Sequence, residues 1–216
     1  INRITALNIS VQGCFSNGKL GSTFFMANKI SIRKKKLGER DSLSCKDLEI
    51  AKRKLTVSFS KVVSSFNLKK VGLYFPFRKE ASTEGIMNYL EDLGIATYLP
   101  VISRDTNLRL MKFGKYRMGG RLKENRFGIL EPQDLTFIDP SLIDLFLIPL
   151  VAFDNKGYRL GMGKGYYDTT LFQLNDSKIS KIWGVGYEFQ EEENCFPEPH
   201  DLKLDAVLVP NGLREF

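Results

Sequence analysis

A nearly unbroken apolar stretch at residues 143–151, followed at once by a glycine-rich loop, limits the folds open to this chain. Such a stretch is typical of a strand in the centre of a parallel sheet, where helices cover both faces. A chain of 216 residues built around it is long enough to bury a core without disulfides or structural metals. We therefore expect one α/β domain.

The segments before this strand alternate between helical and extended patterns. A short basic helix is predicted over Ser31–Gly38, and Ser44 with Asp47 resembles a capping box that opens a second helix. The second helix carries apolar residues at three- and four-residue steps, which places them on one stripe facing a core. These residues are Leu48, Ala51, Leu55, Phe59, Val62 and Phe66.

The remaining elements follow a βαβ rhythm, which predicts a mostly parallel sheet with helices on both sides. The helix of this unit is Thr83–Leu93, ended by Gly94, and a further helix is expected after the glycine loop, through Leu174. Residues 127–132 form a turn-bearing connector. The predicted strands are Val71–Phe75, Ala96–Ile102, Leu108–Phe113, Ile143–Val151, Trp183–Tyr187 and Ala206–Val209.

Charge and cysteine content restrict partners and compartment. The net charge of +7 suits nucleic acid, an anionic membrane surface or a small polyanionic substrate. No RNA-binding signature or long basic tail is present, and no apolar run approaches the roughly 18 residues needed to cross a bilayer. We therefore expect small-molecule substrates and neither a nucleic-acid nor a membrane partner. We also expect a monomer. Cys14, Cys45 and Cys195 are widely spaced, which indicates neither a disulfide framework nor a zinc site and favours the cytoplasm.

Residues 1–25 differ from the rest, because they contain no acidic residue and are rich in Ser, Asn and Gly. They could be the remnant of a transit peptide, which would imply organellar import, or an extension ahead of a natural start at Met26. We favour the extension. The expected division is an N-terminal extension over residues 1–25 and a catalytic domain over residues 26–216.

The glycine loop lies between the apolar strand and the helix expected after it. Asp154–Gly157 is predicted to form a tight turn, and the glycines at alternate positions from Gly161 to Gly165 allow a ligand to approach the backbone N–H groups closely. Arg159 and Lys164 add positive charge, and the N-terminus of a helix would add more. An anion such as phosphate is the expected ligand, although the glycines alone are also compatible with a flexible turn.

Known nucleotide loops do not match this spacing. A Walker A loop requires Ser or Thr after its lysine, where this chain has Gly165, and the dinucleotide fingerprint has a different glycine spacing. The segment from Phe153 to Asp168, together with the preceding Ala152, reads Ala-Phe-Asp, then a turn, then Arg-Leu-Gly-x-Gly-x-Gly-Tyr-Tyr-Asp. This segment resembles the signature of the 5-formyltetrahydrofolate cyclo-ligase family.

The resemblance continues in order along the chain from about Met26 to the C-terminus. It includes Lys-x-x-x-Arg at residues 29–33, Tyr-Phe-Pro at residues 74–76 followed by Glu80 and Thr83, and Phe-Gly-Ile-x-Glu-Pro at residues 127–132. Glu-Pro-His-Asp at residues 198–201 precedes Leu-Asp-Ala-Val at residues 204–207. The family implies a three-layer α/β/α fold similar to the sugar-phosphate isomerase and CoA-transferase group.

The resemblance also implies a reaction, in which ATP and Mg²⁺ support the cyclisation of 5-formyltetrahydrofolate to 5,10-methenyltetrahydrofolate, with the formyl oxygen phosphorylated on the way. The catalytic residues implied are four cations that would stabilise the negative charge on the transferred phosphoryl group: Lys29, Arg33, Arg159 and Lys164. The ATP-binding residues so implied are Lys29, Arg33, Arg159, Leu160, Gly161, Met162, Gly163, Lys164, Gly165, Tyr166 and Tyr167. The folate contacts are Glu80, Met162, Gly163, Lys164, Gly165 and Tyr166, and the Mg²⁺ ligands are Asp168 and Asp205.

Several alternatives stay open at this point. Asp205 alone could cap a turn, and one of Tyr166 and Tyr167 is expected to pack against the sheet while the other lines the folate pocket. Phe127 could pack or stack on a pteridine, and the single His200 is expected to be structural. Other possible functions are a sugar-phosphate isomerase or CoA-transferase-like enzyme, a basic nucleic-acid-binding protein, and a binding module that senses folate or ATP.

Overall fold

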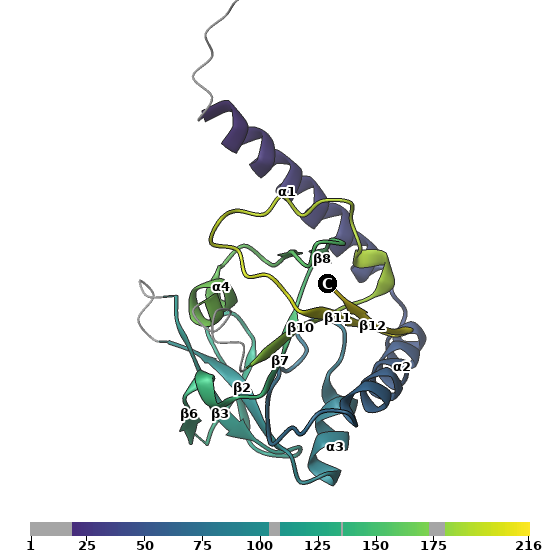
Figure 1. The fold of residues 1–216 in the computed structure, drawn as a ribbon, viewed down its shortest axis with the longest axis vertical. Helices are drawn as coiled ribbons and strands as arrows, with labels where there is room; N and C mark the ends of the chain where they lie inside the picture. Colours follow the sequence, from purple (N-terminus) through teal and green to yellow (C-terminus); the bar gives the residue numbers. More distant parts are fainter. Residues whose placement is uncertain (1–18, 104–108, 135, 173–179) are drawn as a thin grey trace, which may run out of the picture.

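The apolar stretch forms β7 at the centre of an 8-stranded sheet in the computed structural model (Figure 1), which describes residues 19–103, 109–134, 136–172 and 180–216. In spatial order the strands are β12 (Gly212–Glu215), β11 (Ala206–Val209), β10 (Lys181–Val185), β7 (Leu145–Pro149), β1 (Lys70–Gly72), β2 (Ala96–Ile102), β3 (Met111–Tyr116) and β6 (Phe137–Ile138). The central position expected for the stretch is confirmed.

Parallel pairing dominates the sheet. β11, β10, β7, β1 and β2 run parallel, and Leu145 of β7 faces Val71 of β1 on one side and Lys181 of β10 on the other. The edges are antiparallel, with β12 beside β11, β3 beside β2, and β6 beside β3. Two small hairpins lie outside the sheet: β4 (Leu122–Glu124) with β5 (Leu130–Pro132), and β8 (Ala152–Phe153) with β9 (Arg159–Leu160).

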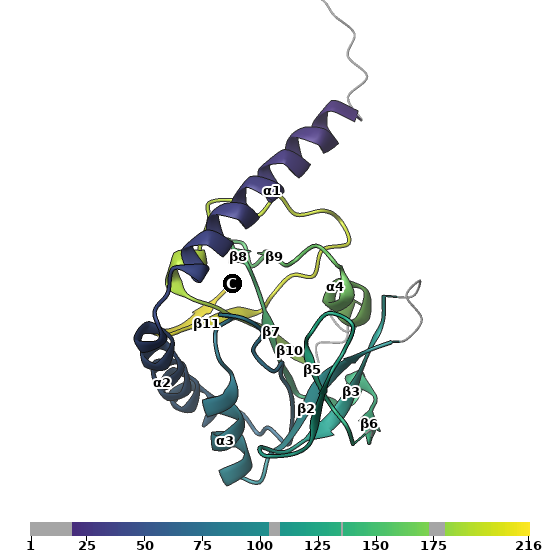
Figure 2. The same ribbon diagram turned by 180° about the vertical axis from the view of Figure 1, so that it is seen from behind.

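Helices cover both faces of the sheet, which confirms the α/β fold (Figures 1 and 2). They are α1 (Lys19–Asp41), α2 (Cys45–Val63), α3 (Glu84–Asp92) and α4 (Tyr166–Leu171), with short 3-10 turns η1 (Pro140–Leu142) and η3 (Glu188–Gln190). Successive residues of β7 point to opposite faces. Leu145 and Leu147 therefore pack in the core under α2 and α3, whereas Phe146 and Ile148 pack with Leu171 of α4.

The sequence predicts α2 well. Its capping box is present, because the Ser44 hydroxyl accepts from the Asp47 N–H and the Asp47 carboxylate accepts from the Ser44 N–H. Leu55 and Phe59 of its apolar stripe are fully buried, and the other members of the stripe are partly buried against the same core. α3 also begins after Thr83 as expected, and Gly94 follows it with φ 72°.

The structure differs from the expected elements mainly at their ends. α1 extends from Lys19 to Asp41, far beyond the predicted Ser31–Gly38; its first turn has no acidic residue to mark the start. β1 ends at Gly72, three residues before the predicted end at Phe75, and Pro76 has no N–H with which to continue the ladder. β3 begins at Met111, and Leu108 and Leu174 lie outside the described residues.

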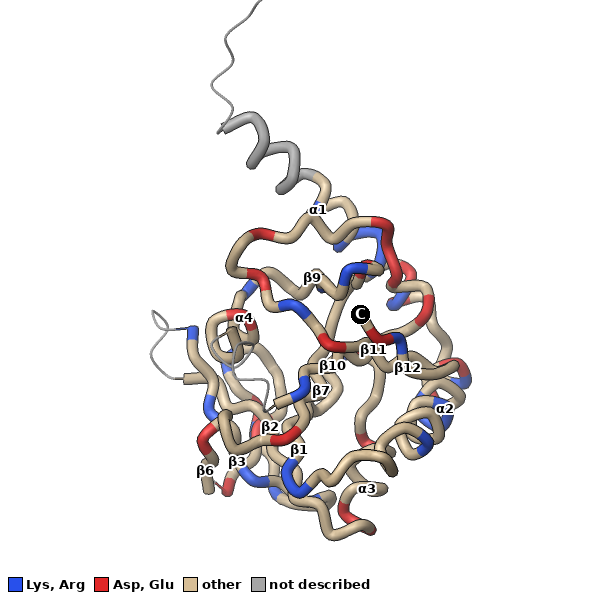
Figure 3. The backbone as a smooth tube through the Cα atoms, viewed as in Figure 1, with Lys and Arg blue, Asp and Glu red and all other residues tan. Residues whose placement is uncertain are grey.

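Other global expectations concern membranes, thiols and charge. No helix in the described ranges is long and apolar enough to cross a membrane. Cys45 is exposed, Cys195 is buried, and both are free thiols. Basic and acidic residues are interspersed along the chain in the view of Figure 3, with lysines and arginines on α2 and near the β2–β3 edge.

Candidate active site

The glycine loop joins β9 to α4, and two of its glycines have a left-handed backbone conformation. Gly163 has φ 80° and Gly165 has φ 73°, a left-handed region that side-chain-bearing residues adopt only with strain. A Cβ added to Gly163 would lie 3.6 Å from Cζ of Arg33. Because α4 spans six residues, the positive charge near the loop comes mainly from side chains.

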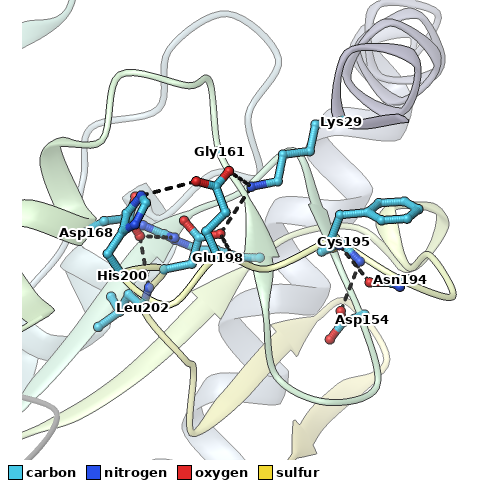
Figure 4. A network of polar contacts seen from close by, with 12 residues as sticks. Lys29, Asp154, Gly161, Asp168, Asn194, Cys195, Glu198, His200 and Leu202 are labelled. Carbon is cyan, nitrogen blue, oxygen red and sulfur yellow. Dashed lines mark hydrogen bonds and ion pairs between the residues drawn. The ribbon is translucent and has the colours of Figure 1, made fainter. Parts of the chain in front are cut away.

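Asp154 fixes the turn that leads into this loop, as predicted for Asp154–Gly157. The side chain is fully buried, and its Oδ1 accepts from the backbone N–H groups of Lys156 and Tyr158, both at 3.0 Å. Its Oδ2 accepts from the Cys195 N–H at 3.0 Å, which ties the turn to the segment that precedes residue 198 (Figure 4).

Lys29 reaches from α1 into a cluster of carboxylates formed by the Glu198–Asp201 segment (Figure 4). Its Nζ lies 2.8 Å from Glu198 Oε1 and 3.3 Å from Asp201 Oδ2, and the lysine side chain is 10 % exposed. His200 is mostly exposed, with Nε2 3.6 Å from Glu198 Oε2. The Lys29 ammonium is thus held in a nearly buried position by two acceptors that bear negative charge.

Arg33 lies one turn further along α1, against the glycine loop. Its Nε donates to the Gly161 carbonyl at 2.8 Å. Burial lowers the pKa of the Arg33 guanidinium, and the charge of Asp201 opposes that shift. The helix therefore delivers two of the predicted cations, Lys29 and Arg33, to the same side of the loop.

Arg159 and Asp168 form a nearly buried ion pair across the loop. Arg159 Nη1 donates to Asp168 Oδ1 at 2.8 Å, and the arginine side chain is 4 % exposed. The Leu202 N–H donates to the same Oδ1 at 3.2 Å. Burial acts to raise the pKa of Asp168, but the charge and hydrogen bond of Arg159 and the bond from Leu202 outweigh it, so the pKa lies below its ordinary value.

Asp205 lies at the start of β11 and has different partners from Asp168. Its Oδ2 accepts from the Ile182 N–H at 2.8 Å, and its Oδ1 lies 3.1 Å from Lys181 Nζ. These bonds join the beginnings of β10 and β11. They agree with the alternative that Asp205 caps a turn, which the sequence left open beside metal binding. Within the described residues, no cluster of three or more carboxylate, histidine or cysteine side chains could bind a metal.

Glu80 lies in a buried polar cluster with Arg40 of α1. Its Oε2 accepts from the Phe77 N–H at 3.1 Å, and its Oε1 lies 3.9 Å from Arg40 Nη1. Burial raises the pKa of Glu80, while the Phe77 hydrogen bond and Arg40 oppose the shift. The hydroxyl pKa of Tyr167 is also raised, by burial and by the charge of Glu80, which connects this cluster to the end of the glycine loop.

The exposed side of the loop carries Lys164 and Tyr166 beside the β4–β5 hairpin. The rings of Phe127 and Tyr166 meet edge to face, with centroids 6.2 Å apart. The Arg126 Nη2 donates to the Tyr166 hydroxyl at 2.9 Å, and Lys164 Nζ lies 5.8 Å from the Phe127 ring centroid. Met162 is about half exposed. Phe127 is partly exposed and contacts the site instead of the core.

The structure thus brings most of the predicted residues to the glycine loop, whereas Asp205 is engaged at the strand starts. Sequence reasoning assigned no role to Glu198, Asp201, Arg40 or Arg126. For Glu198 and Asp201 a signal existed, since their motif was noticed, but nothing local indicated that it would meet a helix 169 residues earlier.

Comparisons with known proteins show the family of the chain. The model of the 5-formyltetrahydrofolate cyclo-ligase family matches residues 25–210. A 5-formyltetrahydrofolate cyclo-ligase of Haemophilus influenzae is 34 % identical over 172 residues, which is 79 % of this chain and 91 % of that protein.

Two solved structures share the fold. A 5,10-methenyltetrahydrofolate synthetase of Mycoplasma pneumoniae has a TM-score of 0.66 and 28 % identity over 84 % of this chain and 98 % of that one. The synthetase of Aquifex aeolicus has a TM-score of 0.71 and 28 % identity over 87 % of this chain and 92 % of that one. The chain therefore belongs to the 5-formyltetrahydrofolate cyclo-ligase family.

Proposed function

We propose that the protein uses ATP to close 5-formyltetrahydrofolate to 5,10-methenyltetrahydrofolate, with release of ADP and phosphate. The observation that carries the proposal is the convergence of α1 on the glycine loop. Arg33 binds the Gly161 carbonyl and lies against Gly163, and Lys29 lies one turn earlier on the same helix. Backbone N–H groups and cations arranged in this way favour the phosphates of a nucleotide.

The ion pairs of Lys29 support a specific mode of nucleotide binding. Glu198 and Asp201 supply the negative charge beside its ammonium, and phosphate oxygens carry the same charge in the same hydrogen-bonding role. We expect the phosphates of ATP to exchange with these carboxylates at Lys29, while Arg33 and Lys164 contact the phosphates from the loop. Residues 159–167 would surround the nucleotide.

The residues present fit Mg²⁺ only in company with the nucleotide. Arg159 and Leu202 both donate to Oδ1 of Asp168, so Oδ2 is the oxygen that we expect to be available to a metal. Both oxygens of Asp205 are already engaged. Mg²⁺ usually binds through one or two carboxylates together with substrate phosphates and water. We therefore favour Asp168 as the protein ligand, and Asp205 would have to release Lys181 or Ile182 to join it.

Glu80 is the residue that we propose to recognise the folate. Its side chain is 13 % exposed, and one carboxylate oxygen accepts from the Phe77 N–H. The second oxygen faces Arg40, whose charge opposes the rise in the pKa of Glu80 that burial causes. A carboxylate held in one orientation can accept hydrogen bonds from the N–H groups of a pteridine ring, which supports the assignment. Tyr167, in the first turn of α4, is close enough to Glu80 for the charge of that carboxylate to raise the pKa of its hydroxyl.

The proposed chemistry needs no nucleophilic side chain. The formyl oxygen attacks the γ-phosphorus; a new P–O bond forms, the bond to the β-phosphate oxygen breaks, and ADP leaves. N10 then attacks the formyl carbon and loses its proton to water, and the activated C–O bond breaks to release phosphate. Lys29, Arg33 and Lys164 would compensate the charge on the transferred group, and Arg159 would orient Asp168. Mg²⁺, when bound, would neutralise further phosphate charge.

Mixing the purified protein with MgATP and 5-formyltetrahydrofolate tests the proposal. We expect the absorbance of 5,10-methenyltetrahydrofolate to rise, with ADP formed in equal amount, and no rise when ATP is omitted. Product without ATP consumption, or ATP hydrolysis that does not depend on folate, would contradict it.

A further inference from the structure

Glu80 lies in a turn that is fastened to the C-terminal end of α1. The Glu80 N–H donates to the Phe77 carbonyl at 3.2 Å, which closes the turn. Lys79 Nζ donates to the carbonyl of Asp41, the last residue of α1, at 2.5 Å and to that of Leu43 at 2.7 Å. These bonds between the turn and the helix end fix the place of the turn.

Arg40 lies one residue before the end of α1 and has unused hydrogen-bond donors. Its side chain is 2 % exposed, and its Nε and Nη1 have no hydrogen-bond partner among the described residues. Buried donors without partners cost free energy, so their presence calls for a reason. Attachment of the turn does not supply that reason, because Lys79 already makes it.

The geometry between Arg40 and Glu80 supplies charge without a hydrogen bond. Arg40 Nη1 lies 3.9 Å from Glu80 Oε1, which is too far for a hydrogen bond and close enough for attraction between opposite charges. The Phe77 N–H donates to Oε2, so Oε1 keeps its lone pairs for a ligand. An arginine side chain does not deprotonate in proteins, so the positive charge beside Oε1 is permanent.

The other titratable groups around Glu80 are tyrosine hydroxyls, which are neutral at neutral pH. They are Tyr74, Tyr167 and Tyr187, and they come from three different parts of the chain. Burial raises the pKa of all three hydroxyls, and the negative charge of Glu80 raises it further. Among these neighbours, Arg40 is the one that stabilises a negative charge on Glu80.

We propose that Arg40 is a positioning residue of the folate site, which holds the Glu80 carboxylate ionised and in one orientation for the substrate. The inference rests on the proposed function, in which that carboxylate accepts hydrogen bonds from the N–H groups of the pteridine. A protonated Glu80 would present a donor to those donors, and binding would weaken. Arg40 acts against protonation, since its charge opposes the rise in the pKa of Glu80 that burial causes.

The pH dependence of folate binding tests the inference without turnover. Calorimetry with 5-formyltetrahydrofolate from about pH 6 to about pH 9 gives the acid midpoint, the pH at which affinity has fallen to half its plateau value. Arg40→Gln removes the charge that favours ionised Glu80, so the acid midpoint should rise by at least about one pH unit. Affinity should fall about tenfold below both midpoints and recover toward that of the unaltered protein at alkaline pH.

A conservative variant and a matched control separate this role from a structural one. Arg40→Lys keeps the positive charge and should keep the acid midpoint near that of the unaltered protein. Arg53→Gln is the control, because Arg53 pairs with Glu49 at 3.0 Å on the exposed surface of α2, and it should leave the pH dependence unchanged. A loss of folate affinity in Arg40→Gln that is equal at every pH would show a structural role and overturn the inference. An unchanged pH dependence would overturn it as well.

The remaining outcomes also decide the matter. If Arg40→Gln does not fold, Arg40→Lys is the test: an acid midpoint raised by about one pH unit in spite of the retained charge would overturn the inference, and an unchanged one would support it. If the midpoint of Arg40→Gln rises as expected but no cyclisation is detected, the role of Arg40 stands and the proposed function fails. An active enzyme without the rise leaves the proposed function intact and removes the inference.

Discussion

Arg159 Nη1 and Asp168 Oδ1 lie 2.8 Å apart, although the two residues are nine positions apart on opposite sides of the glycine loop. The pair closes the loop at its base. Because Asp168 also accepts from the Leu202 N–H, it connects the loop to the segment that carries Glu198 and Asp201.

Removal of this carboxylate should destabilise the fold as well as the site. Asp168→Ala leaves the Arg159 charge buried without a partner, and breaking a buried pair in this way costs about 3 kcal/mol. We expect urea denaturation to show that loss in the free energy of unfolding. Asp92→Ala, at an exposed position at the end of α3, should change it by less than about 0.5 kcal/mol. A loss below about 1 kcal/mol for Asp168→Ala would contradict the role given to the pair.

The same pair predicts a pH dependence. The pKa of Asp168 in the folded protein lies below its ordinary value, and an aspartate in an unfolded chain has a pKa of about 3.9. The pair therefore contributes its full stability above that unfolded pKa and loses it as pH falls through the lower folded pKa. Unfolding free energies of the protein and Asp168→Asn, measured from neutral pH to about pH 3, should converge as pH falls. A constant difference would show that the charge of Asp168 is not responsible.

Glu80→Gln tests folate recognition separately from nucleotide binding. A hydrogen bond to a charged acceptor contributes about 1.5–3 kcal/mol, so the KM for 5-formyltetrahydrofolate should rise roughly 10- to 100-fold. The KM for MgATP should change little. Glu84→Gln is a suitable control, because that carboxylate contacts Ser82 and Lys52 instead of the buried cluster. Parallel increases in both KM values would indicate a general structural effect.

Two glycines of the loop should respond differently to alanine. Gly163 has φ 80°, so Gly163→Ala should lower the free energy of unfolding by about 1–2 kcal/mol. Gly161 has no positive φ, and a Cβ there would meet nothing within 4 Å, so Gly161→Ala should have little effect on stability. Thermal denaturation of both variants compares them directly. Equal losses would mean that the left-handed conformation of Gly163 is not required.

Local patterns predicted much of the fold. The apolar stretch gave the central strand because no polar residue interrupts it beyond Asp144, and Ser44 with Asp47 marked the start of α2 because capping depends on neighbouring residues. The start of α1 carried no such signal. β12 was missed, since its pairing with β11 depends on a turn and on an edge position that a short C-terminal segment does not reveal.

The site was predictable in its glycine loop and not in its long-range pairs. Asp154 and Gly157 form a turn within four residues, so the sequence indicates it. The contact of Arg40 with Glu80 and the contact of Lys29 with Asp201 depend on how α1 lies against distant loops. That geometry follows from the packing of the whole domain, and residue types alone do not specify it.

The central claim is that the loop from Gly161 to Gly165, with Lys29 and Arg33, binds the triphosphate of ATP. Calorimetric titration of the purified protein with MgATP tests it most directly. We expect saturable binding at one site, weakened at least about tenfold by Lys29→Met and unchanged by Lys34→Met, which alters an exposed lysine on the same helix. No detectable binding to the folded protein, or equal binding by both variants, would contradict the claim.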